Sequence, residues 1–417
     1  MLKRIHLQGV GPAPEMAVDL APRLNLLTGD NGVGKTFLLD IAWWALTGDW
    51  GSWPAWPSTA ADTPRIEYVF ESSDGPVGAG SSFDFEEQRW ENPRIILPAS
   101  LVLYARVDGS FSLWDPARNG PGNRPLVEQP YHFSRETLWD GLTAAGRIRC
   151  EGLIRDWVSW QRQGSEAFLQ LEAVLKSLSP GEEEELRPGN PTRVSLDDVR
   201  DHPTLQMPYG TVPLILASAG MKRVISLAYL LVWAWQEHQR ASQLLRQPEA
   251  DRIVFLIDEV ESHLHPRWQR LFLPALLSVM DRLRSDVQVQ LIATTHAPLV
   301  LASVEPEFEE DRDALIHLAL EGGSVRVENQ PWAKQGDAVN WLVSESFGLL
   351  QARSRDAERA IEAAEAWMRG DRAALPRDLA TRDAIHAELV RLLPGHDPFW
   401  PRWIVATEKP PRVARPA

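Results

Sequence analysis

Residues 23–36 read RLNLLTGDNGVGKT, an apolar strand followed by a glycine-rich turn and a Lys-Thr pair that opens an apolar helix. Gly29, Gly34, Lys35 and Thr36 fit the pattern G-x-x-x-x-G-K-[ST]. The glycines of this pattern let successive backbone N–H groups converge on the phosphates of a nucleotide at a helix N-terminus. The lysine reaches the β- and γ-phosphates, and the Thr hydroxyl holds Mg²⁺. The predicted nucleotide contacts are Asn31, Gly32, Val33, Gly34, Lys35, Thr36 and Phe37.

A second apolar run, Ile253–Ile257, ends in Asp258 and Glu259. A continuous apolar run of this length is typical of a buried parallel strand. Asp258 is the predicted second Mg²⁺ ligand beside Thr36, acting directly or through water. Glu259 is the predicted catalytic residue that orients or deprotonates the attacking water. An acidic strand end without chemistry is the alternative interpretation, and the phosphate loop upstream disfavours it.

A third candidate site lies in the stretch ASAGMKR, residues 217–223, before a helix predicted over Met221–Gln239. That helix is apolar nearly all round in its middle, which indicates burial. Ser218 and Gly220 at a helix N-terminus combine a hydroxyl, free backbone N–H groups and the helix dipole, and together these favour an anion. A simple helix cap is the alternative for Ser218.

The fourth signal is ATTHAP, residues 293–298, at the end of a strand predicted over Val287–Thr295. His296 there is a candidate catalytic residue, because an imidazole at a strand end can hydrogen-bond a γ-phosphate or the hydrolytic water. A histidine with a purely structural hydrogen bond is the alternative. A helix is predicted between the two strands over Trp268–Leu283, with a kink at Pro274.

Composition bounds the class of protein. The chain has 417 residues and 44% apolar content, enough for one large α/β domain or two to three smaller ones. The lone Cys150 excludes an internal disulfide and indicates a buried thiol in a reducing cytoplasm. The longest apolar run, Leu227–Trp235, is about half a membrane span, and the N-terminal residues do not resemble a signal peptide. A net charge of −14 argues against nucleic-acid binding over the whole surface but leaves a local basic groove open.

The order of patterns predicts an α/β protein of four regions, with a mixed or parallel sheet. They are an N-terminal lobe with the phosphate loop (1–133), a helical insertion (134–205), a C-terminal lobe with the remaining motifs (206–350) and a small helical tail (351–417). The N-terminal lobe is expected to contain strands at Lys3–Gln8 and Arg65–Glu71 and a mobile Gly/Ser-rich loop at Ser72–Ser82. A strand over Arg94–Arg106 is expected to form a hairpin with Phe111–Trp114. The tail is expected to end near Pro394, with loose Pro-rich residues beyond it.

The succession of phosphate loop, Ser-x-Gly, Asp-Glu strand and strand-end histidine resembles the ABC-class ATPases. More narrowly, it resembles their SMC, RecF and OLD branch and short relatives in bacterial anti-phage systems. Residues 258–266, DEVESHLHP, are similar to the family's D-E-x-E-x-H-L-H-P run, and residues 294–298, TTHAP, are similar to T-T-H-S-P. The resemblance covers roughly residues 1–350.

This resemblance implies an ABC-type ATPase head that uses ATP and Mg²⁺. It also implies a homodimer in which Ser218 and Gly220 of one protomer close over ATP held by Lys35 of the other. The signature here is SAGMK rather than the transporter form LSGGQ, and Gln129 is an unconfirmed candidate for the Q-loop glutamine. His263 and His265 would suit the dimer-facing loop. A zinc site there is disfavoured because no Cys or further His lies close by in sequence.

The predicted function is an ATPase that dimerises with ATP and gates a separate effector, such as a nuclease of anti-phage defence. No nuclease signature, zinc-finger spacing or coiled-coil arm is recognisable in the sequence, so the effector is expected on another protein. A RecF-like DNA-repair ATPase that binds DNA itself is the main alternative. A transporter subunit fits the signature poorly, and a scaffold that does not hydrolyse ATP is disfavoured by the presence of both Asp258 and Glu259. No membrane association is expected.

Overall fold

The computed structural model describes residues 1–58, 63–72, 75–91, 100–119, 129–181, 184–283 and 287–407. The chain divides into two compact units, Met1–Trp341 and Leu342–Ala417. The larger unit carries all the residues predicted to bind or hydrolyse the nucleotide.

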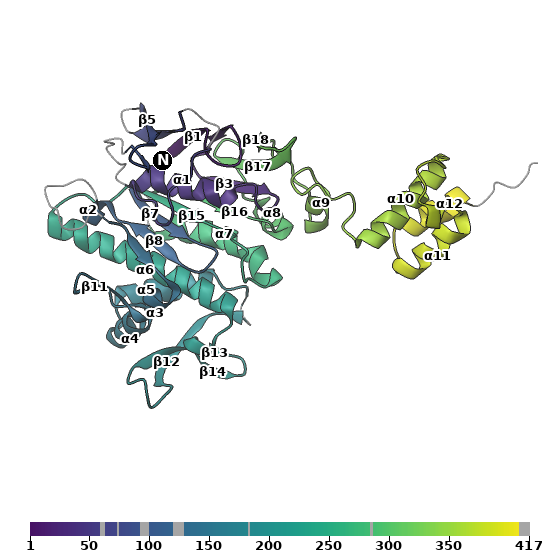
Figure 1. Cartoon of the computed structure of the whole chain (residues 1–417). Helices are drawn as coiled ribbons and strands as arrows, with labels where there is room; N and C mark the ends of the chain where they lie inside the picture. Colours follow the sequence, from purple (N-terminus) through teal and green to yellow (C-terminus); the bar gives the residue numbers. More distant parts are fainter. Residues whose placement is uncertain are drawn as a thin grey trace, which may run out of the picture. The chain divides into compact units, whose positions relative to one another are not determined.

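A mixed sheet runs through the larger unit (Figure 1). Its strand order in the described residues is β18-β17-β3-β16-β15-β7-β8-β9. Neighbours from β17 to β7 are parallel, whereas β18, β8 and β9 are antiparallel additions. The predicted α/β class with a mixed sheet is therefore confirmed. The strands are β3 (Leu24–Gly29), β7 (Ser100–Ala105), β8 (Phe111–Trp114), β9 (Tyr131–Phe133), β15 (Arg252–Ile257), β16 (Gln288–Thr294), β17 (Asp313–Glu321) and β18 (Ser324–Gln330).

Register places the ends of the central strands at one level. Ile257 of β15 pairs with Ala293 of β16, and Thr294 pairs with Leu27 of β3. Because these strands are parallel, their carboxyl ends meet at the same edge of the sheet, where ligands of open α/β sheets bind. The phosphate loop, the Asp-Glu pair and the TTH segment therefore leave the sheet side by side. The predicted hairpin after Ala105 is also present, since β7 pairs antiparallel with β8, and residues 94–99 of the expected strand Arg94–Arg106 lie outside the described residues.

A second, antiparallel sheet is formed near the N-terminus, with the order β2-β1-β4-β5-β6 among described residues. The expectation of a mobile loop over Ser72–Ser82 is wrong, because β5 pairs with β4 along its length. The small residues of this segment give no strong strand pattern in the sequence. It is a strand because β4 provides hydrogen-bond partners for its backbone N–H and C=O groups. The strands are β1 (Leu2–Gln8), β2 (Glu15–Asp19), β4 (Arg65–Ser72), β5 (Gly75–Asp84) and β6 (Arg89–Trp90).

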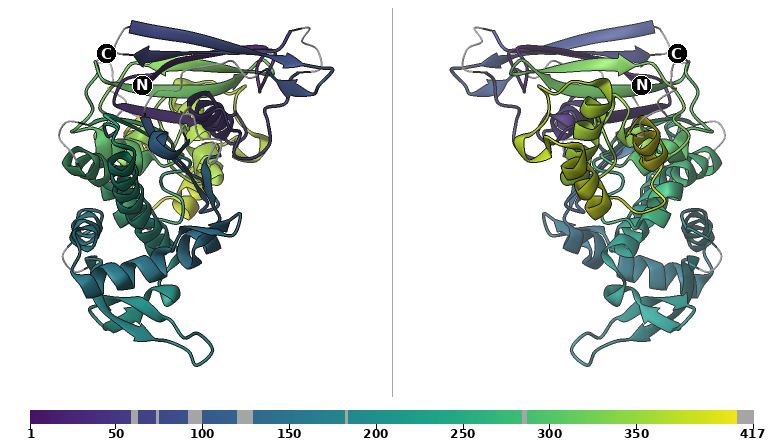
Figure 2. Two further views of the ribbon diagram at one scale, coloured as in Figure 1. Left: turned by 90° about the vertical axis from the view of Figure 1, so that its left-hand side faces the viewer. Right: turned by 90° about the vertical axis from the view of Figure 1, so that its right-hand side faces the viewer.

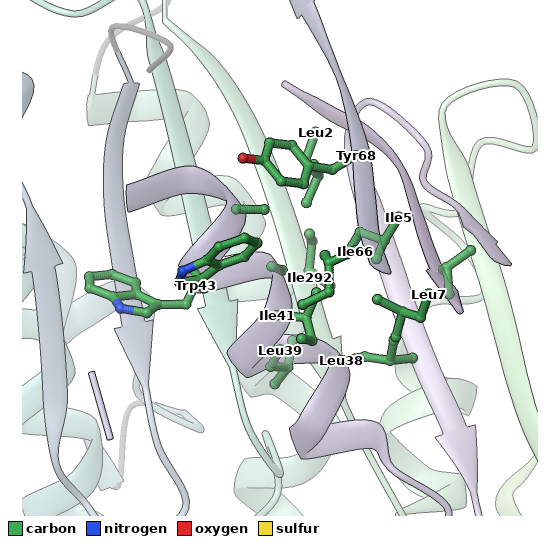
Figure 3. Packing of buried hydrophobic residues seen from close by; sticks show 14 of the residues in the cluster. Leu2, Ile5, Leu7, Leu38, Leu39, Ile41, Trp43, Ile66, Tyr68 and Ile292 are labelled. Atoms are coloured by element: carbon green, nitrogen blue, oxygen red, sulfur yellow. The ribbon is translucent and has the colours of Figure 1, made fainter. Parts of the chain in front are cut away.

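Helix α1 (Lys35–Thr47) packs in a core shared by the two sheets, and Figure 3 shows its Leu38, Leu39 and Ile41 beside Ile66 of β4 and Ile292 of β16. All of these side chains are buried. The first helix is thus fixed along its length by apolar packing on both sides. Only its N-terminal end is left at the edge of the sheet.

Other helices cover the opposite face of the mixed sheet (Figure 1). In β15, Val254 and Leu256 belong to the core around α1, while Phe255 is buried on the other side because side chains alternate along a strand. The long helix predicted from Met221 is confirmed and is buried through its middle. The helices of this layer and its neighbourhood are α2 (Pro116–Asn119), α6 (Ala219–Leu245), α7 (Pro266–Leu283, containing Pro274), α8 (Pro298–Val304) and α9 (Ala338–Leu342).

The segment predicted as a helical insertion contains helices and two small sheets. The β10–β11 hairpin and the strands from β12 onward were not anticipated, because their alternation is short and interrupted by Gly and Pro. The predicted boundary between the insertion and the C-terminal lobe, after residue 205, falls within β13. This boundary remains a prediction. The elements are α3 (Arg135–Asp140), β10 (Leu142–Ala144), β11 (Arg147–Cys150), α4 (Leu153–Gln163), α5 (Glu166–Ser177), β12 (Arg187–Arg193), β13 (Asp201–Met207), β14 (Gly210–Pro213) and the 3₁₀ turn Leu214–Leu216.

The smaller unit is helical, as predicted for the tail. Its helices are α10 (Arg355–Arg369), the 3₁₀ turn Arg377–Leu379, α11 (Arg382–Leu392) and α12 (Phe399–Thr407). The expectation that structure ends near Pro394 is wrong, since Phe399 and Trp403 of α12 belong to the buried core of this unit. The Pro-rich residues from 408 onward lie outside the described residues. In the part of the chain that the structure describes, no helix combines the length and the apolar character needed to span a membrane.

Candidate functional site

The phosphate loop connects β3 to α1 through glycines with positive φ. Gly29 has a φ of 131° and Gly34 a φ of 99°, conformations that residues with a side chain rarely adopt. A Cβ added to Gly29 would lie 2.1 Å from the backbone oxygen of Leu318, so only glycine fits there. Gly34 occupies the N-cap position of α1 and offers no capping side chain. The first turn of α1 therefore presents backbone N–H groups toward the loop, as an anion site requires.

Lys35 is buried beneath this loop. Its Nζ donates to the backbone oxygens of Gly29, at 2.8 Å, and Asp30, at 2.7 Å. Burial lowers the pKa of Lys35, and the nearby carboxylates of Asp258 and Glu259 oppose that shift. The ammonium group thus lies against the curled loop, where a phosphate oxygen could replace one of the two carbonyls.

Asp258 is the centre of a hydrogen-bonded set that joins three strands and α1. Thr36 Oγ1 donates to its carboxylate at 3.1 Å from Oδ1 and 3.0 Å from Oδ2. Thr294 Oγ1 lies 2.7 Å from Asp258 Oδ1, and the Asp258 N–H donates to the backbone oxygen of Ala105 at 2.9 Å. Asp258 is 1% exposed, so its carboxylate can be neutralised only by groups within the site. A hydroxyl and a buried carboxylate in contact are oxygen donors of the kind that Mg²⁺ prefers.

Glu259 follows in a left-handed conformation, with a φ of 46°. Its N–H donates to Thr294 Oγ1 at 2.7 Å, which fixes the backbone, and the residue lines a cavity. This cavity has a volume of about 220 Å³. The residues that line it are Asn31, Gly32, Gly34, Lys35, Thr36, Asp258, Glu259, Thr294 and His296.

His296 lines the same cavity, and Glu261 holds its backbone. The Glu261 carboxylate accepts from Thr295 Oγ1 at 2.8 Å and from the His296 N–H at 2.5 Å. This clamp joins the loop after β15 to the end of β16. Glu261 and Thr294 were not among the predicted site residues, although Glu261 is the second acid of the DEVE run and Thr294 precedes the TTH histidine.

Arg223 in the first turns of α6 is a further residue that the sequence did not single out. Its Nη2 donates to the backbone oxygens of Asp258 at 2.8 Å and Glu259 at 3.1 Å. Its Nη1 donates to the backbone oxygen of Val107 at 3.1 Å. Burial lowers the pKa of Arg223. The guanidinium thus holds the backbone beside the predicted catalytic carboxylate, and only tertiary structure brings these segments together.

Ser218 and Gly220 lie outside the residues that line the 220 Å³ cavity. Ser218 is exposed and caps α6, since its Oγ accepts from the Met221 N–H at 3.3 Å. A Cβ added to Gly220 would lie 2.5 Å from the backbone oxygen of His263, so glycine allows α6 to approach the DEVESHLHP loop. Within one chain, the structure therefore does not bring the second anion site to the phosphate loop.

The other predicted residues differ in what they can offer a ligand. The Val33 side chain is buried in the core, and Phe37 packs against that core, so these two can offer backbone groups from the loop and the first turn of α1. Gln129 is exposed, its backbone oxygen accepts from Asn119 Nδ2 at 2.7 Å, and it does not line the cavity.

Among the described residues, no group of three or more His, Cys, Asp and Glu side chains is placed to hold a metal ion. Cys150 is a buried free thiol, and burial raises its pKa to about 12.

Comparisons with known proteins identify a family and several relatives. Residues 24–302 match the family described as AAA domain, putative AbiEii toxin, type IV TA system. Septu protein PtuA of Bacillus mycoides (strain KBAB4) is 31% identical over 139 residues, which are 32% of this chain and 16% of the relative. Septu protein PtuA of Bacillus thuringiensis is 25% identical over 143 residues, 33% of this chain and 32% of the relative. The Retron Vc95 probable ATPase of Vibrio cholerae serotype O1 biovar El Tor is 39% identical over 54 residues, 13% of this chain and 9% of the relative.

The chain thus spans less than a third of the length of these curated relatives. Among solved structures, the SMC head domain from Thermotoga maritima has a TM-score of 0.41 at 15% identity, covering 79% of this chain and 99% of that one. An SMC head bound to the C-terminal winged-helix domain of ScpA has a TM-score of 0.43 at 15% identity, covering 80% and 98%.

Proposed function

The chain belongs to the family of AAA domains described as putative AbiEii toxins of type IV toxin–antitoxin systems, as the motif resemblance to short ABC-class ATPases predicted, and on this premise we propose that it binds and hydrolyses ATP. The observation that carries the proposal is the Asp258 carboxylate, held between Thr36 and Thr294 in a cavity at the uncapped N-terminus of α1. The cavity can enclose phosphates, and its donors suit a nucleotide with Mg²⁺.

Each residue has a proposed role. Backbone N–H groups from Asn31 to Phe37 and the Lys35 ammonium bind the phosphates. Thr36 and Asp258 would hold Mg²⁺, which neutralises phosphate charge when bound. Glu259 accepts the proton of the attacking water, and its fixed backbone keeps the carboxylate beside the cavity. His296 binds the γ-phosphate or the water, positioned by Glu261.

We also propose that two protomers share each ATP. Ser218 is exposed, Gly220 is partly buried, and both remain outside the chain's own cavity, although they lie at a helix N-terminus of the kind that binds phosphate. A second protomer is the simplest source of the phosphate they would bind. The homodimer would then hold two ATP molecules, each between the phosphate loop of one chain and the Ser-x-Gly of the other.

Mixing two inactive variants tests this arrangement. Lys35→Ala should bind ATP roughly 10- to 100-fold more weakly and not hydrolyse it, and Ser218→Arg should bind ATP without hydrolysing it. In a mixed dimer, one site combines an intact Lys35 with an intact Ser218, and the other site carries both substitutions. Part of the ATPase activity should therefore return after the protomers exchange. If activity does not return, Asn31→Cys combined with Ala219→Cys should form disulfides between chains when ATP is present. The native Cys150 is buried and should not compete. Crosslinks formed only within one chain would overturn the shared site.

The biological role that we propose is control of a separate effector in cytoplasmic anti-phage defence, supported by the motif resemblance to short ATPases of anti-phage systems and by the likeness to a Septu protein and a retron ATPase. The helical tail, predicted from residue 351, would be the docking element, because it follows the last ATPase motif and has a core of its own. Removal of residues 342–417 should spare ATP hydrolysis and abolish control of the effector. Loss of hydrolysis in a folded protein would place the tail in the catalytic domain.

A further inference from the structure

An exposed aromatic patch lies on the larger unit, away from the residues that line the phosphate-loop cavity. It is built around Trp56 and Phe85, which are 70% and 48% exposed, and Trp53, which precedes Trp56 in the same loop, is 89% exposed. The two tryptophans lie in the loop after α1, and Phe85 lies in the turn between β5 and β6. This hairpin is at the outer edge of the N-terminal sheet (Figure 2). Clustered large apolar side chains on a surface mark interaction sites, whereas single ones need no explanation.

The rings of Trp56 and Phe85 share an aromatic base. Trp56 and Phe85 both contact Phe83, with ring centroids 6.4 Å and 5.2 Å away. Phe83 contacts the buried Trp90 at 5.4 Å, and Trp90 Nε1 donates to the backbone oxygen of Ala55 at 2.8 Å. The hydrogen bond ties the tryptophan loop to the hairpin. A surface held in this way loses little conformational entropy when a partner binds.

The rim of the patch is acidic. Asp84 Oδ1 accepts from the N–H groups of Glu86 at 2.8 Å and Glu87 at 3.0 Å, which orders the turn that carries these acids. Glu86, Glu87 and Glu91 are exposed. Arg89 is the basic residue of this hairpin turn, and its guanidinium pairs with Glu87. The sequence between Thr36 and Ser58 contains no Lys or Arg.

We infer that the aromatic patch docks a basic segment of a partner protein. Guanidinium and ammonium groups are attracted to the faces of Trp and Phe rings, and they pair with carboxylates at the rim. A purely apolar partner would desolvate the acids without compensation, and nucleic acid would be repelled by them. Arginine is suited to both parts of this surface, because its planar group stacks on rings and pairs with carboxylates. Proteins that act on nucleic acids carry basic surfaces, so a nuclease effector could supply the basic segment.

This inference does not rest on the proposed ATPase function, because no residue of the patch lines the cavity. The experiment uses the full chain and a fluorescein-labelled peptide of alternating Arg and Ala, with Glu replacing Arg in a second peptide. Fluorescence anisotropy should show binding of the basic peptide and not of the acidic one. The double variant Trp53→Ala/Trp56→Ala, which loses exposed side chains only, should weaken this binding about tenfold. Glu86→Lys should weaken it by a similar factor.

Matched variants separate the patch from general attraction to an acidic protein. Tyr209→Ala removes an exposed aromatic ring elsewhere, and Glu310→Lys reverses an exposed charge elsewhere. Both should leave the peptide affinity within about twofold of wild type. Mg–ATP affinity and turnover should be unchanged in the patch variants, so failure of docking and failure of the ATPase proposal are distinguishable.

Three results would overturn the inference. Equal peptide affinity in wild type and the double tryptophan variant would mean diffuse electrostatic binding. Duplex DNA that binds wild type and loses affinity in the tryptophan variant would assign the patch to nucleic acid. A wild-type oligomer that dissociates in that variant, measured by sedimentation, would assign the patch to a second copy of this chain.

Discussion

Two helix starts, those of α1 and α6, look alike in the sequence but differ in the structure. Each has a glycine at or just inside its N-terminus, and each carries a lysine near its first turn. The N-terminus of α1 lacks a side-chain cap and opens into the cavity that contains Asp258. The N-terminus of α6 is capped by Ser218 and is exposed. An anion-site pattern therefore predicts a ligand within the chain only when buried charged groups, such as Lys35 and Asp258 at α1, surround the helix N-terminus.

The largest effect is expected from the carboxylate that faces the cavity. Glu259→Gln should lower kcat roughly 100- to 10,000-fold while ATP binding persists, because an amide cannot accept the proton of water. Steady-state hydrolysis at saturating ATP gives kcat, and light scattering should show an accumulated ATP-bound dimer. Glu261→Gln is the matched control in the same loop, and its smaller loss should come from a weakened clamp on His296. An unchanged kcat in Glu259→Gln would move the catalytic role to His296.

The two lysines provide the next test. Lys35 and Lys222 both donate to backbone oxygens of the segment before their helix, Lys35 to Gly29 and Lys222 to Ile215. Lys35→Ala should weaken Mg–ATP binding roughly 10- to 100-fold, since it removes a charged hydrogen bond to phosphate. Lys222→Ala should leave the affinity of the isolated protomer unchanged. Calorimetric titration measures both, and equal losses would contradict the distinction between the two helix starts.

Substitutions of Ser218 can separate its role as a helix cap from its proposed contact with the ATP that the partner protomer binds. Ser218→Asp keeps a good N-cap, so thermal stability should be retained, yet its charge would repel the γ-phosphate and lower turnover by at least roughly tenfold. Ser218→Ala should lose about 1 kcal/mol of stability with a smaller loss of turnover. Thermal melts and steady-state ATPase assays measure the two effects. Full activity in Ser218→Asp would leave Ser218 as a helix cap alone.

The smallest effect concerns the support of α6 behind its N-terminus. Apolar packing fixes α1, whereas Tyr229 of α6 donates to Asp156 at 2.7 Å and lies 3.2 Å from Cys150 Sγ. Burial raises the pKa of Asp156 to about 6. The folded chain therefore holds this proton more tightly than the unfolded chain, and the stability it contributes is lost as pH rises from about 4 through about 6.

Asp156→Asn should remove this part of the pH dependence. Denaturant unfolding between pH 4 and 7 should show a loss on the order of 2 kcal/mol across this window in wild type that is absent in the variant. Tyr229→Phe at constant pH is the control for loss of the hydrogen bond alone. Parallel stability curves for wild type and Asp156→Asn would show that Asp156 does not titrate in this range.

Sequence alone predicted the parts of the fold that depend on local pattern. The phosphate loop, the buried strand before Asp258, the long buried helix from Met221 and the β7–β8 hairpin all follow from apolar periodicity and glycine placement over short stretches. The patterns failed where local signals are weak. β5 is rich in glycine and serine and is a strand because β4 supplies its hydrogen bonds, and α12 forms because Phe399 and Trp403 find a core.

The residues available for phosphate chemistry can be identified from local motifs, because Gly34, Lys35, Thr36, Asp258 and Glu259 stand in patterns with a local physical meaning. Tertiary structure alone decided how they meet. Parallel register brings the end of β15 beside those of β3 and β16, so Thr36 and Thr294 converge on one carboxylate from positions far apart in the chain. Arg223 and Glu261 acquire their roles in the same way. Their partners are backbone groups of distant segments, and no local pattern records a contact that exists only when the sheet has formed.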